Sequence, residues 1–329
     1  MRVEARVLAE LSEEGYSSGQ AISEKLHITR SAVWKHIVKL RERGYVIEAS
    51  PRHGYRLAAR PDKLLPGEIT PLLKTRVIGS RIVHLEETGS TADDARRLID
   101  DGAGEGTVVL AESQTSGRGR LGREWRTSPG QAIALSVVLY PDLPPTQVPL
   151  LSLATGLAAR NAVAAVVGEA PAPVLKWPND IYLNGRKLGG VLVEMAAELD
   201  HVKWVIASIG LNVNNSFEGT DLSGTATSLA TELGRKVSRR DLAVALLGEL
   251  DSVYDKARTP PGRTDIRHEF EQLDLLRGHR VEVVTPGGTV SGVATGIDAE
   301  GRLLVRRPDG EVEALFSGEA SLTGSGRVA

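Results

Sequence analysis

The sequence predicts an α+β protein built from three parts. About the first sixty residues hold three segments with helical apolar spacing and then two short strand-like segments. A longer central region mixes strands with helices, and about the last fifty residues form short strands separated by turns. Because 329 residues suffice for two or three domains, we predict domains at residues 1–60, 61–275 and 276–329.

Composition limits the classes of function that remain open. The formal net charge is −2, so any nucleic-acid-binding surface must be local. The chain has no cysteine, which excludes disulfides, thiolate metal sites and thiol nucleophiles. Residues 1–6 contain no apolar run suited to a signal peptide, and we expect no apolar stretch to approach the roughly 20 residues of a membrane span. These features predict a soluble cytoplasmic protein without membrane contact.

Helix signals recur through the first part. Residues 3–12 carry apolar side chains at helical spacing, and Ser18 opens a short second helix. Thr29 is a good N-cap for a third helix from Arg30 to Arg43. Gly44 suits the position just after the end of that helix.

Two strand-like segments, residues 45–49 and 54–57, follow these helices. Three helices and a β-ribbon in this order resemble a winged helix-turn-helix whose third helix is the recognition helix. Residues 30–60 hold eight basic and two acidic side chains, a local excess that suits phosphate contacts. The alternatives are a solvated basic face or a winged helix used for protein contacts. We predict DNA binding through Gly19, Gln20, Arg30, Ser31, Trp34, Lys35 and Lys39, and a linker at residues 60–62.

The central region opens with a strand at residues 81–85, a polar turn and a helix that ends near Asp101. In the turn, Ser90 or Thr91 stands three positions before an acidic residue, which is the pattern of a helix N-cap. Capping alone is the simpler interpretation. The alternative is ligand binding, because a strand-to-helix turn offers free N–H groups and hydroxyls to a polar ligand.

A loop from Gly117 to Trp125 organises the whole chain. It holds three glycines and three arginines within seven residues, between strands predicted at residues 107–112 and 132–140. Glycines allow close approach of a ligand, and guanidinium groups match phosphate or carboxylate oxygens in pairs. The spacing fits neither a P-loop nor a dinucleotide-binding fingerprint. A solvated basic loop or an RNA-binding segment remains the alternative.

The second informative stretch is residues 174–183. Lys176 ends a short apolar strand immediately before a Pro-Asn-Asp turn, and could be either a solvated strand end or a fixed cation for a phosphate. The dipeptide Asn184-Gly185 predicts a hairpin whose second strand is 187–194. Paired glycines at 189 and 190 indicate a bulge or the close approach of another group.

The remaining segments are assigned by the same signals. We predict an apolar helix at residues 147–167, buried against a sheet, and a strand at 203–210 that leads to Asn212. A helix opens after residues 224–229, Ser238 caps a helix at 239–256, and Thr264 caps a shorter one. Strands at 280–284, 289–297, 303–306 and 312–315 predict a small SH3-like β-barrel.

Taken together, the chain resembles the biotin–protein ligases, in the bifunctional form that also represses the biotin operon. The resemblance runs over nearly the whole length. The Gly-Arg-Gly-Arg-x-Gly-Arg loop and Lys-Trp-Pro-Asn-Asp at this separation are together highly specific, whereas either alone would be weak. The matching segments are the winged helix, Ser90-Thr91, Gln114, residues 117–123, Trp125, 176–180, 187–194, 210–212 and the last strands.

The resemblance implies a class II synthetase-like central sheet and a two-step reaction. Biotin and ATP, with Mg²⁺, would give biotinoyl-5′-AMP and pyrophosphate, and a lysine of biotin carboxyl carrier protein would then take the biotinoyl group. The family would also bind operator DNA as a homodimer promoted by the adenylate. No residues of this chain are assigned as ligands of a metal.

Site residues follow from the same resemblance. The catalytic residues would be Lys176, the main charge on the phosphate and carboxylate oxygens, and Arg118, which closes the ligand loop. Biotin would be bound by Ser90, Thr91, Ala92, Gln114, Arg118, Gly119, Arg120 and Lys176. The nucleotide would be bound by Arg120, Arg123, Trp125 and Asn212.

One departure and two alternatives accompany this assignment. Many relatives have asparagine where this chain has Ala92, so a side-chain contact from that position is lost and a backbone contact can remain. The first alternative is a transcription factor that senses a ligand without ligase activity, which the intact Lys176 and loop arginines disfavour. The second is a lipoyl or octanoyl transferase of related fold, which the arginine loop and the winged helix disfavour.

Overall fold

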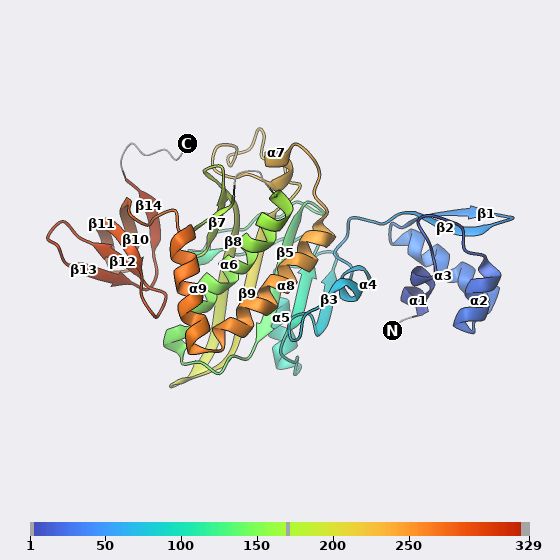
Figure 1. The fold of residues 1–329 in the computed structure, drawn as a ribbon, viewed down its shortest axis with the longest axis horizontal. Coiled ribbons are helices and arrows are strands. Elements are labelled where there is room, and N and C mark those ends of the chain that lie inside the picture. The colour runs from blue at the N-terminus through green and yellow to red at the C-terminus, as the bar shows by residue number, and fades with distance from the viewer. Residues whose placement is uncertain (1–2, 169–171, 324–329) are drawn as a thin grey trace. The chain divides into compact units, whose positions relative to one another are not determined.

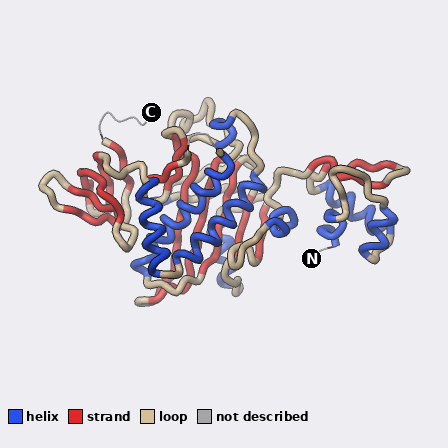
Figure 2. The backbone as a smooth tube through the Cα atoms, viewed as in Figure 1, coloured by secondary structure: helices blue, strands red, loops and turns tan. Residues whose placement is uncertain are grey.

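The chain divides into two compact units, Met1–Lys63 and Leu64–Ala329 (Figure 1). The computed structural model describes residues 3–168 and 172–323. Residues 1–2 and 324–329, at the outer ends of the first and third predicted domains, lie outside the described residues. The α+β class predicted from the sequence is confirmed, because helices and strands share each unit (Figure 2).

The first unit is three helices followed by an antiparallel hairpin. Its elements are α1 (Val3–Ala9), α2 (Gly19–Leu26), α3 (Arg30–Glu42), β1 (Val46–Ser50) and β2 (Gly54–Ala59). Ser18 caps α2 by accepting a hydrogen bond from the N–H of Ala21, and Thr29 caps α3 by accepting one from Ala32. The cap predicted at Thr29 is confirmed, and α2 begins after Ser18 as predicted.

Apolar side chains from all three helices close the core of the first unit. Val7 of α1, Ile22 of α2, and Val33 and Ile37 of α3 are buried, as is Leu57 of β2. The helix α1 ends at Ala9, three residues before the predicted end, although Leu11 beyond it is still buried. The hydrophobic spacing therefore marked the buried face correctly and overestimated the length of the helix.

A mixed seven-stranded sheet forms the centre of the second unit. The strand order is β3-β4-β5-β9-β8-β7-β6, with β3 and β4 parallel and all other neighbours antiparallel. The strands are β3 (Arg81–Leu85), β4 (Thr107–Ala111), β5 (Ala132–Leu139), β6 (Val174–Lys176), β7 (Asp180–Leu183), β8 (Arg186–Glu198) and β9 (His201–Asn212).

Helices cover both faces of this sheet. Side chains alternate along a strand, so Val108 and Leu110 of β4 pack with the core under α6 (Val148–Val167), α8 (Arg239–Ala257) and α9 (Pro260–Leu273). Val109 points the other way and packs with Ala95 of α5 (Thr91–Asp100). Figure 1 shows α6, α8 and α9 side by side across one face of the strands.

The helix α6 corrects one expectation from the sequence. Within the described residues, the segment Pro145–Val167 is long and apolar enough to cross a bilayer, by length and composition alone. No stretch of that kind was expected. The structure gives a physical reason for its composition, because 67% of its most apolar window is buried inside the protein and the helix packs on α8, α9 and the sheet. Its burial against a sheet was predicted and is confirmed.

A second correction concerns the start of α9. Thr264 was predicted to cap this helix, but the helix begins at Pro260 and is capped by Thr259, whose hydroxyl accepts a hydrogen bond from the N–H of Gly262. Thr264 lies inside the helix and donates its hydroxyl to the carbonyl of Pro260. A proline at the first helical position was the signal that the prediction overlooked.

Short helices and a second sheet complete the second unit. The short elements are α4 (Pro66–Ile69), α7 (Leu229–Leu233) and three 3₁₀ turns at Thr70–Leu72, Arg120–Gly122 and Pro145–Gln147. The second sheet is antiparallel in the order β13-β12-β11-β10-β14. Its strands are β10 (Arg280–Thr285), β11 (Gly288–Ile297), β12 (Leu303–Arg306), β13 (Val312–Leu315) and β14 (Glu319–Leu322). Four were predicted and β14 was missed; closure into an SH3-like barrel stays a prediction.

The two threonines near the start of α9 provide a stability test. We predict that Thr259→Ala lowers the free energy of unfolding by about 1 kcal/mol, because an N-cap acceptor is lost. Thr264→Ala is the matched control and should cost less than about 0.5 kcal/mol at its exposed position. Urea unfolding followed by tryptophan fluorescence measures both changes. A larger loss for Thr264→Ala than for Thr259→Ala would contradict the assignment of the cap.

Candidate active site

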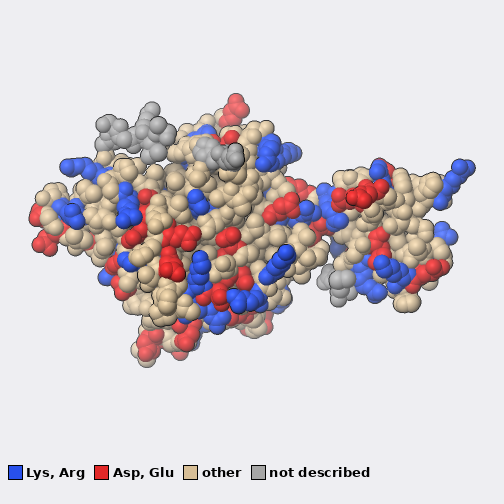
Figure 3. Space-filling model, in the orientation of Figure 1, with Lys and Arg blue, Asp and Glu red and all other residues tan. Residues whose placement is uncertain are grey.

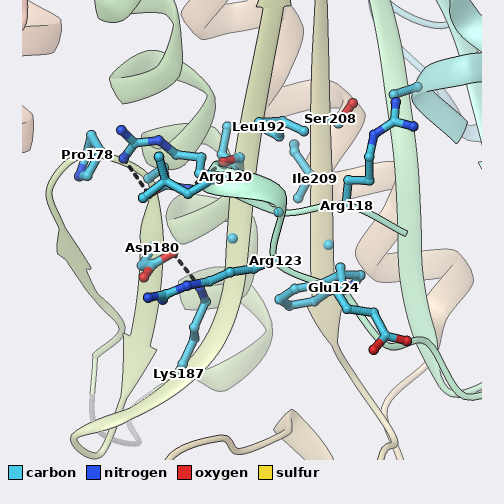
Figure 4. Close-up of a pocket in the computed structure, with 18 of the residues that line it drawn as sticks. Arg118, Arg120, Arg123, Glu124, Pro178, Asp180, Lys187, Leu192, Ser208 and Ile209 are labelled. Carbon is cyan, nitrogen blue, oxygen red and sulfur yellow. Dashed lines mark hydrogen bonds and ion pairs between the residues drawn. The ribbon is translucent and has the colours of Figure 1, made fainter. Parts of the chain in front are cut away.

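A cavity of about 240 Å³ lies where the N-terminus of α5, the Gly117–Trp125 loop, the β6–β7 turn and the segment entering β14 meet (Figure 4). All four elements belong to the second unit. The cavity therefore collects side chains from segments that are more than two hundred residues apart in sequence, from Ser90 to Ala320.

The turn before α5 forms one wall. Ser90 occupies the N-cap position but makes no capping hydrogen bond with its side chain, so capping alone does not explain this residue. Thr91 instead turns toward Gln114: its N–H and its hydroxyl both donate to Gln114 Oε1, at 2.9 and 3.1 Å. Ser136 donates to the hydroxyl of Thr91 at 2.8 Å and contacts the hydroxyl of Ser208 at the same distance. This chain of hydroxyls and an amide is suited to a ligand with several polar atoms.

Internal hydrogen bonds fold the Gly117–Trp125 loop into a defined shape. The N–H of Gly119 donates to the carbonyl of Arg123 at 2.7 Å, and that of Trp125 donates to the carbonyl of Gly117 at 2.8 Å. A Cβ on Gly117 would meet the carbonyl oxygen of Trp125 at 2.5 Å, so this position requires glycine. The loop is thus a closed turn that lies along the cavity.

The indole of Trp125 rests directly on the backbone of β9. A Cβ on Gly210 would overlap the indole ring, so the glycine makes room for it. The ring nitrogen of Trp125 is buried and has no hydrogen-bond partner among the described residues. A buried donor without an acceptor is costly, and a bound ligand that supplies an acceptor would remove the cost.

The three loop arginines take different directions. Arg118 makes a bidentate ion pair with Asp93 of α5, and its guanidinium points away from Asp180 and Lys187 in Figure 4. Arg120 reaches toward Asn179 Oδ1 at 3.4 Å, and burial lowers the pKa of its guanidinium. Arg123 pairs with the carboxylate of Glu319 at the start of β14.

Two lysines project into the cavity from neighbouring strands. Lys176 ends β6, and burial lowers the pKa of its amine. Lys187, near the start of β8, lies 2.6 Å from Asp180 Oδ1 and 6.0 Å above the ring of Trp125. Burial, with the negative charge of Asp180, raises the pKa of Tyr182 beside them to about 12, so this phenol stays neutral.

Positive charge exceeds negative charge among the residues that line the cavity. Five are basic (Arg118, Arg120, Arg123, Lys176 and Lys187) and three are acidic (Glu124, Asp180 and Glu319). The described lining contains no histidine or cysteine, so it offers hydroxyls, amides and cations rather than an activated nucleophile. Such a site can bind and orient an anionic substrate and stabilise negative charge that develops during a reaction.

The structure brings together ten of the eleven residues that the sequence assigned to ligand binding: Ser90, Thr91, Ala92, Gln114, Arg118, Gly119, Arg120, Arg123, Trp125 and Lys176 all line the cavity. Asn212 does not line it, because it lies at the end of β9, opposite Ala132 of β5. Sequence reasoning missed Lys187, Ser208 and Glu319. The Asn184-Gly185 turn was a signal for Lys187, since it fixes the register that places this lysine opposite Tyr182.

Glycines near Lys187 allow β8 to pack closely against its neighbouring strands β7 and β9. The register between β7 and β8 shifts at Ile181 and Tyr182, opposite Gly189. A Cβ on Gly189 would meet the carbonyl of Gly210 at 2.7 Å, so the bulge and the close approach predicted from the paired glycines are both confirmed.

A buried ion pair supports the strand that leads to Gln114. Glu112 accepts hydrogen bonds from the N–H of Leu64 at 2.8 Å and from His84 at 3.0 Å, and pairs with the fully buried Arg239 at 2.8 Å. Burial alone would raise the pKa of Glu112, but these partners bring it down to about 2. The pair fixes Glu112, which follows the last residue of β4 and stands two residues before Gln114.

In the first unit, the predicted DNA-contacting residues fall on two adjacent helices. Arg30, Ser31, Trp34, Lys35 and Lys39 are exposed along α3, and Gln20 is exposed on α2, where Gly19 is partly buried. Trp34 is 55% exposed, which is unusual for an indole unless it meets a partner. Lys39 also lies 3.6 Å from the carboxylate of Glu4.

Comparison with known proteins identifies the family. The chain matches the biotin/lipoate A/B protein ligase family over residues 93–214, an HTH domain over 4–56 and the biotin protein ligase C-terminal domain over 278–323. It is 39% identical over 309 residues to the bifunctional ligase/repressor BirA of Bacillus spizizenii, covering 93% of this chain and 94% of the relative. The chain belongs to the BirA family of bifunctional ligase/repressors.

Further members of the family agree with this placement. The biotin–[acetyl-CoA-carboxylase] ligase of Mycobacterium tuberculosis is 36% identical, over 74% of this chain and 92% of the relative. The biotin protein ligase of Aquifex aeolicus, solved in complex with biotin and ATP, superposes with a TM-score of 0.64 at 28% identity. The superposed region covers 75% of this chain and 100% of the Aquifex aeolicus chain. The BirA-type helix-turn-helix lies in the first unit and the ligase fold in the second.

The Glu112 ion pair gives a prediction about pH and stability. Since the folded pKa of Glu112 lies below its ordinary value of 4.5, its contribution is present above about pH 4.5 and is lost as pH falls toward 2. Glu112→Gln should cost about 3–5 kcal/mol near neutral pH, because Arg239 is left buried beside a neutral side chain.

Urea unfolding of wild type and Glu112→Gln across this pH range measures the effect. The difference in unfolding free energy between the two should shrink steadily as the pH falls below about 4.5. A difference that stays constant down to about pH 3 would contradict a charged, stabilising Glu112.

Proposed function

We propose that this protein is a biotin–protein ligase that activates biotin with ATP and transfers it to a lysine of biotin carboxyl carrier protein. The observation that carries the proposal is the cavity, where cations and neutral hydrogen-bonding groups meet at the segments that mark the family. The wall of Ser90, Thr91 and Gln114 suits the ureido head of biotin, and the basic side suits the phosphates of ATP.

The first step joins the biotin carboxylate to the α-phosphorus of ATP. A carboxylate oxygen attacks the phosphorus, the bond to the bridging oxygen breaks, and pyrophosphate leaves. The carboxylate is itself the nucleophile, so the cavity needs no serine, histidine or cysteine to activate it. The protein contributes alignment of two anions and positive charge for the transition state.

The two lysines divide the charge stabilisation. Lys176 is partly desolvated, as its lowered pKa indicates, and a desolvated cation interacts more strongly with a phosphate. Lys187 has Asp180 as a partner at 2.6 Å, which fixes its amine at the cavity wall. We assign Lys176 and Lys187 jointly to the phosphate and carboxylate oxygens, with Arg120 as the third cation.

The carboxylates at the cavity fit Mg²⁺ that arrives with the nucleotide. Among the described residues no group of three or more acidic or histidine side chains could hold an ion by itself. Mg²⁺ in nucleotide sites is often held by one or two carboxylates with substrate phosphates, and Asp180, which also pairs with Lys187, would be the carboxylate that holds it here. The ion would neutralise charge on the leaving pyrophosphate.

In the second step, the neutral amine of the acceptor lysine attacks the acyl carbon of biotinoyl-5′-AMP, and AMP leaves. The mixed anhydride must be kept from water until the acceptor arrives. The Gly117–Trp125 loop is placed for this role, since Arg118, Gly119 and Arg120 line the cavity from the loop. Arg123 and Trp125 lie on the same loop and suit the nucleotide side.

The alternatives account for fewer features of the cavity. A ligand sensor without ligase activity is disfavoured because Lys176 and the loop arginines are all present at the cavity. A lipoyl or octanoyl transferase is disfavoured by the arginine loop at the cavity and by the helix-turn-helix of the first unit.

Removal of the lysine charges tests the chemistry. We predict that Lys176→Met and Lys187→Met each lower biotin-dependent ATP–pyrophosphate exchange by about 10²- to 10³-fold, because transition-state charge loses a stabilising cation. Lys203→Met, on β9, is the matched control and should exchange at the wild-type rate, since Lys203 pairs with Glu198 and does not line the cavity. Exchange at the wild-type rate in both cavity variants would overturn the assignment.

We further propose that the first unit binds operator DNA as a homodimer promoted by the adenylate, so that the protein represses biotin genes. The helix-turn-helix and the exposed residues of α3 support this proposal. Figure 3 shows acidic and basic side chains interspersed over the visible faces of both units, so it is the local basic excess of residues 30–60 that favours the first unit for phosphate contacts. A protein of this kind would act in the cytoplasm.

A gel shift with DNA from upstream of the biotin genes tests repression. Lys35→Ala should weaken binding and reduce its salt dependence, because one phosphate contact is lost. Biotin with ATP should tighten binding, and neither alone should do so. Equal binding with and without both substrates would exclude control by the adenylate.

A further inference from the structure

The Gly117–Trp125 loop is tied to two other structural elements by ion pairs. Arg118 donates to Asp93 of α5 through both ends of its guanidinium, from Nη1 to Oδ2 at 2.8 Å and from Nη2 to Oδ1 at 2.6 Å. Arg123 pairs with Glu319 of β14. One pair thus ties the loop to the central sheet's helix, and the other ties it to the second sheet.

The geometry of the Asp93–Arg118 pair fixes the orientation of the guanidinium group as well as bringing opposite charges together. The planar fork of a guanidinium matches both carboxylate oxygens at once, so the loop can take few positions while the pair holds. The hydrogen bonds from Arg118 lower the pKa of the Asp93 carboxyl, which keeps it charged. Glu194 of β8 adds negative charge near the guanidinium.

The pair faces solvent rather than the ligand space. Asp93 is absent from the residues that line the cavity, whereas Arg118 belongs to them. In Figure 4 the guanidinium of Arg118 extends away from Asp180 and Lys187. The guanidinium of Arg118 is therefore engaged in the ion pair that holds the loop, although Arg118 also lines the cavity.

We propose that Asp93 is a positioning residue that keeps the loop closed through Arg118, and that Glu319 acts in the same way through Arg123. Asp93 itself touches neither substrate. The consequence for catalysis rests on the proposed function: the two pairs set how long biotinoyl-5′-AMP is retained before the acceptor arrives. Loop closure in the ligand-free protein is independent of that function.

Hydrogen exchange on the ligand-free full chain tests loop closure directly. The N–H groups of Gly119, Arg123 and Trp125 are hydrogen-bonded within the loop, so their exchange reports its opening. Asp93→Asn should speed their exchange about two- to five-fold, the range for a partly exposed pair, and high salt should speed the wild type and narrow the difference.

Asp94→Asn is the matched control. Asp94 is the next residue of the same helix, and it bonds Thr88 and pairs with Arg97 rather than with the loop. Asp94→Asn should leave hydrogen exchange in the loop at the wild-type rate. Asp93→Glu keeps the negative charge, so its loop should also exchange at close to the wild-type rate. In the double variant Asp93→Asn with Arg118→Gln, hydrogen exchange in the loop should be no faster than in the single variant that exchanges faster. Wild-type exchange in Asp93→Asn, or additive effects in the double variant, would overturn the proposal.

Retention of the intermediate tests the consequence. Protein loaded with labelled biotin and ATP is chased with unlabelled biotin, and the half-life of bound biotinoyl-5′-AMP is measured. Asp93→Asn and Glu319→Gln should each shorten it about two- to five-fold, less so at high salt. An unchanged or longer half-life would overturn the role in retention. If the wild type forms no adenylate, the proposed function fails while hydrogen exchange still decides loop closure.

Discussion

The cavity holds several partly desolvated cations close together, and fewer carboxylates than cations line it. The rest of the structure must keep these cations in place. Burial lowers the pKa of both Lys176 and Arg120, so each is more costly to keep charged than a solvated group. Asp180 offsets part of this cost for the lysines. The remaining positive charge is available to an anionic ligand. When no ligand is bound, the cations repel one another, and a rigid frame is needed to hold them close together.

The frame consists of ordinary folding interactions placed around the cavity. The strands β6 to β9 fix both lysines through their register, and the indole of Trp125 lies on Gly210 because no side chain intervenes. Glu112 and Arg239 anchor the end of β4 before Gln114. Behind Lys176, the buried Asp274 accepts a hydrogen bond from the N–H of Trp177, and burial raises its pKa to about 6. Each contact stabilises the fold and also places a residue that lines the cavity.

Local signals predicted most elements of this fold, because caps and turns depend on neighbouring residues. Ser18, Thr29 and Ser238 accept the N–H groups expected of N-caps, and Asn184 takes the positive φ of a hairpin turn. One error came where two local signals competed. At α9 a threonine before two prolines was the true cap, and a threonine five residues later was chosen.

Contacts between distant segments were beyond the reach of local patterns. Ser90 fits a capping pattern, yet its hydroxyl makes no cap, since the adjacent Thr91 is drawn to Gln114 of another segment. The Asn184-Gly185 turn could have placed Lys187 opposite Tyr182, but its ion pair with Asp180 is visible only in the structure. The pairing of Arg118 with Asp93 likewise depends on how the loop folds against α5.

The central claim is that the cavity is complementary to the acyl-phosphate that links biotin to AMP. Isothermal titration with a non-reacting analogue of biotinoyl-5′-AMP tests this most directly. The cations and the hydroxyl wall lie in one cavity, so the analogue should bind at least 10²-fold more tightly than biotin or ATP alone, as expected for a ligand resembling an activated intermediate. Binding no tighter than that of biotin would contradict the account.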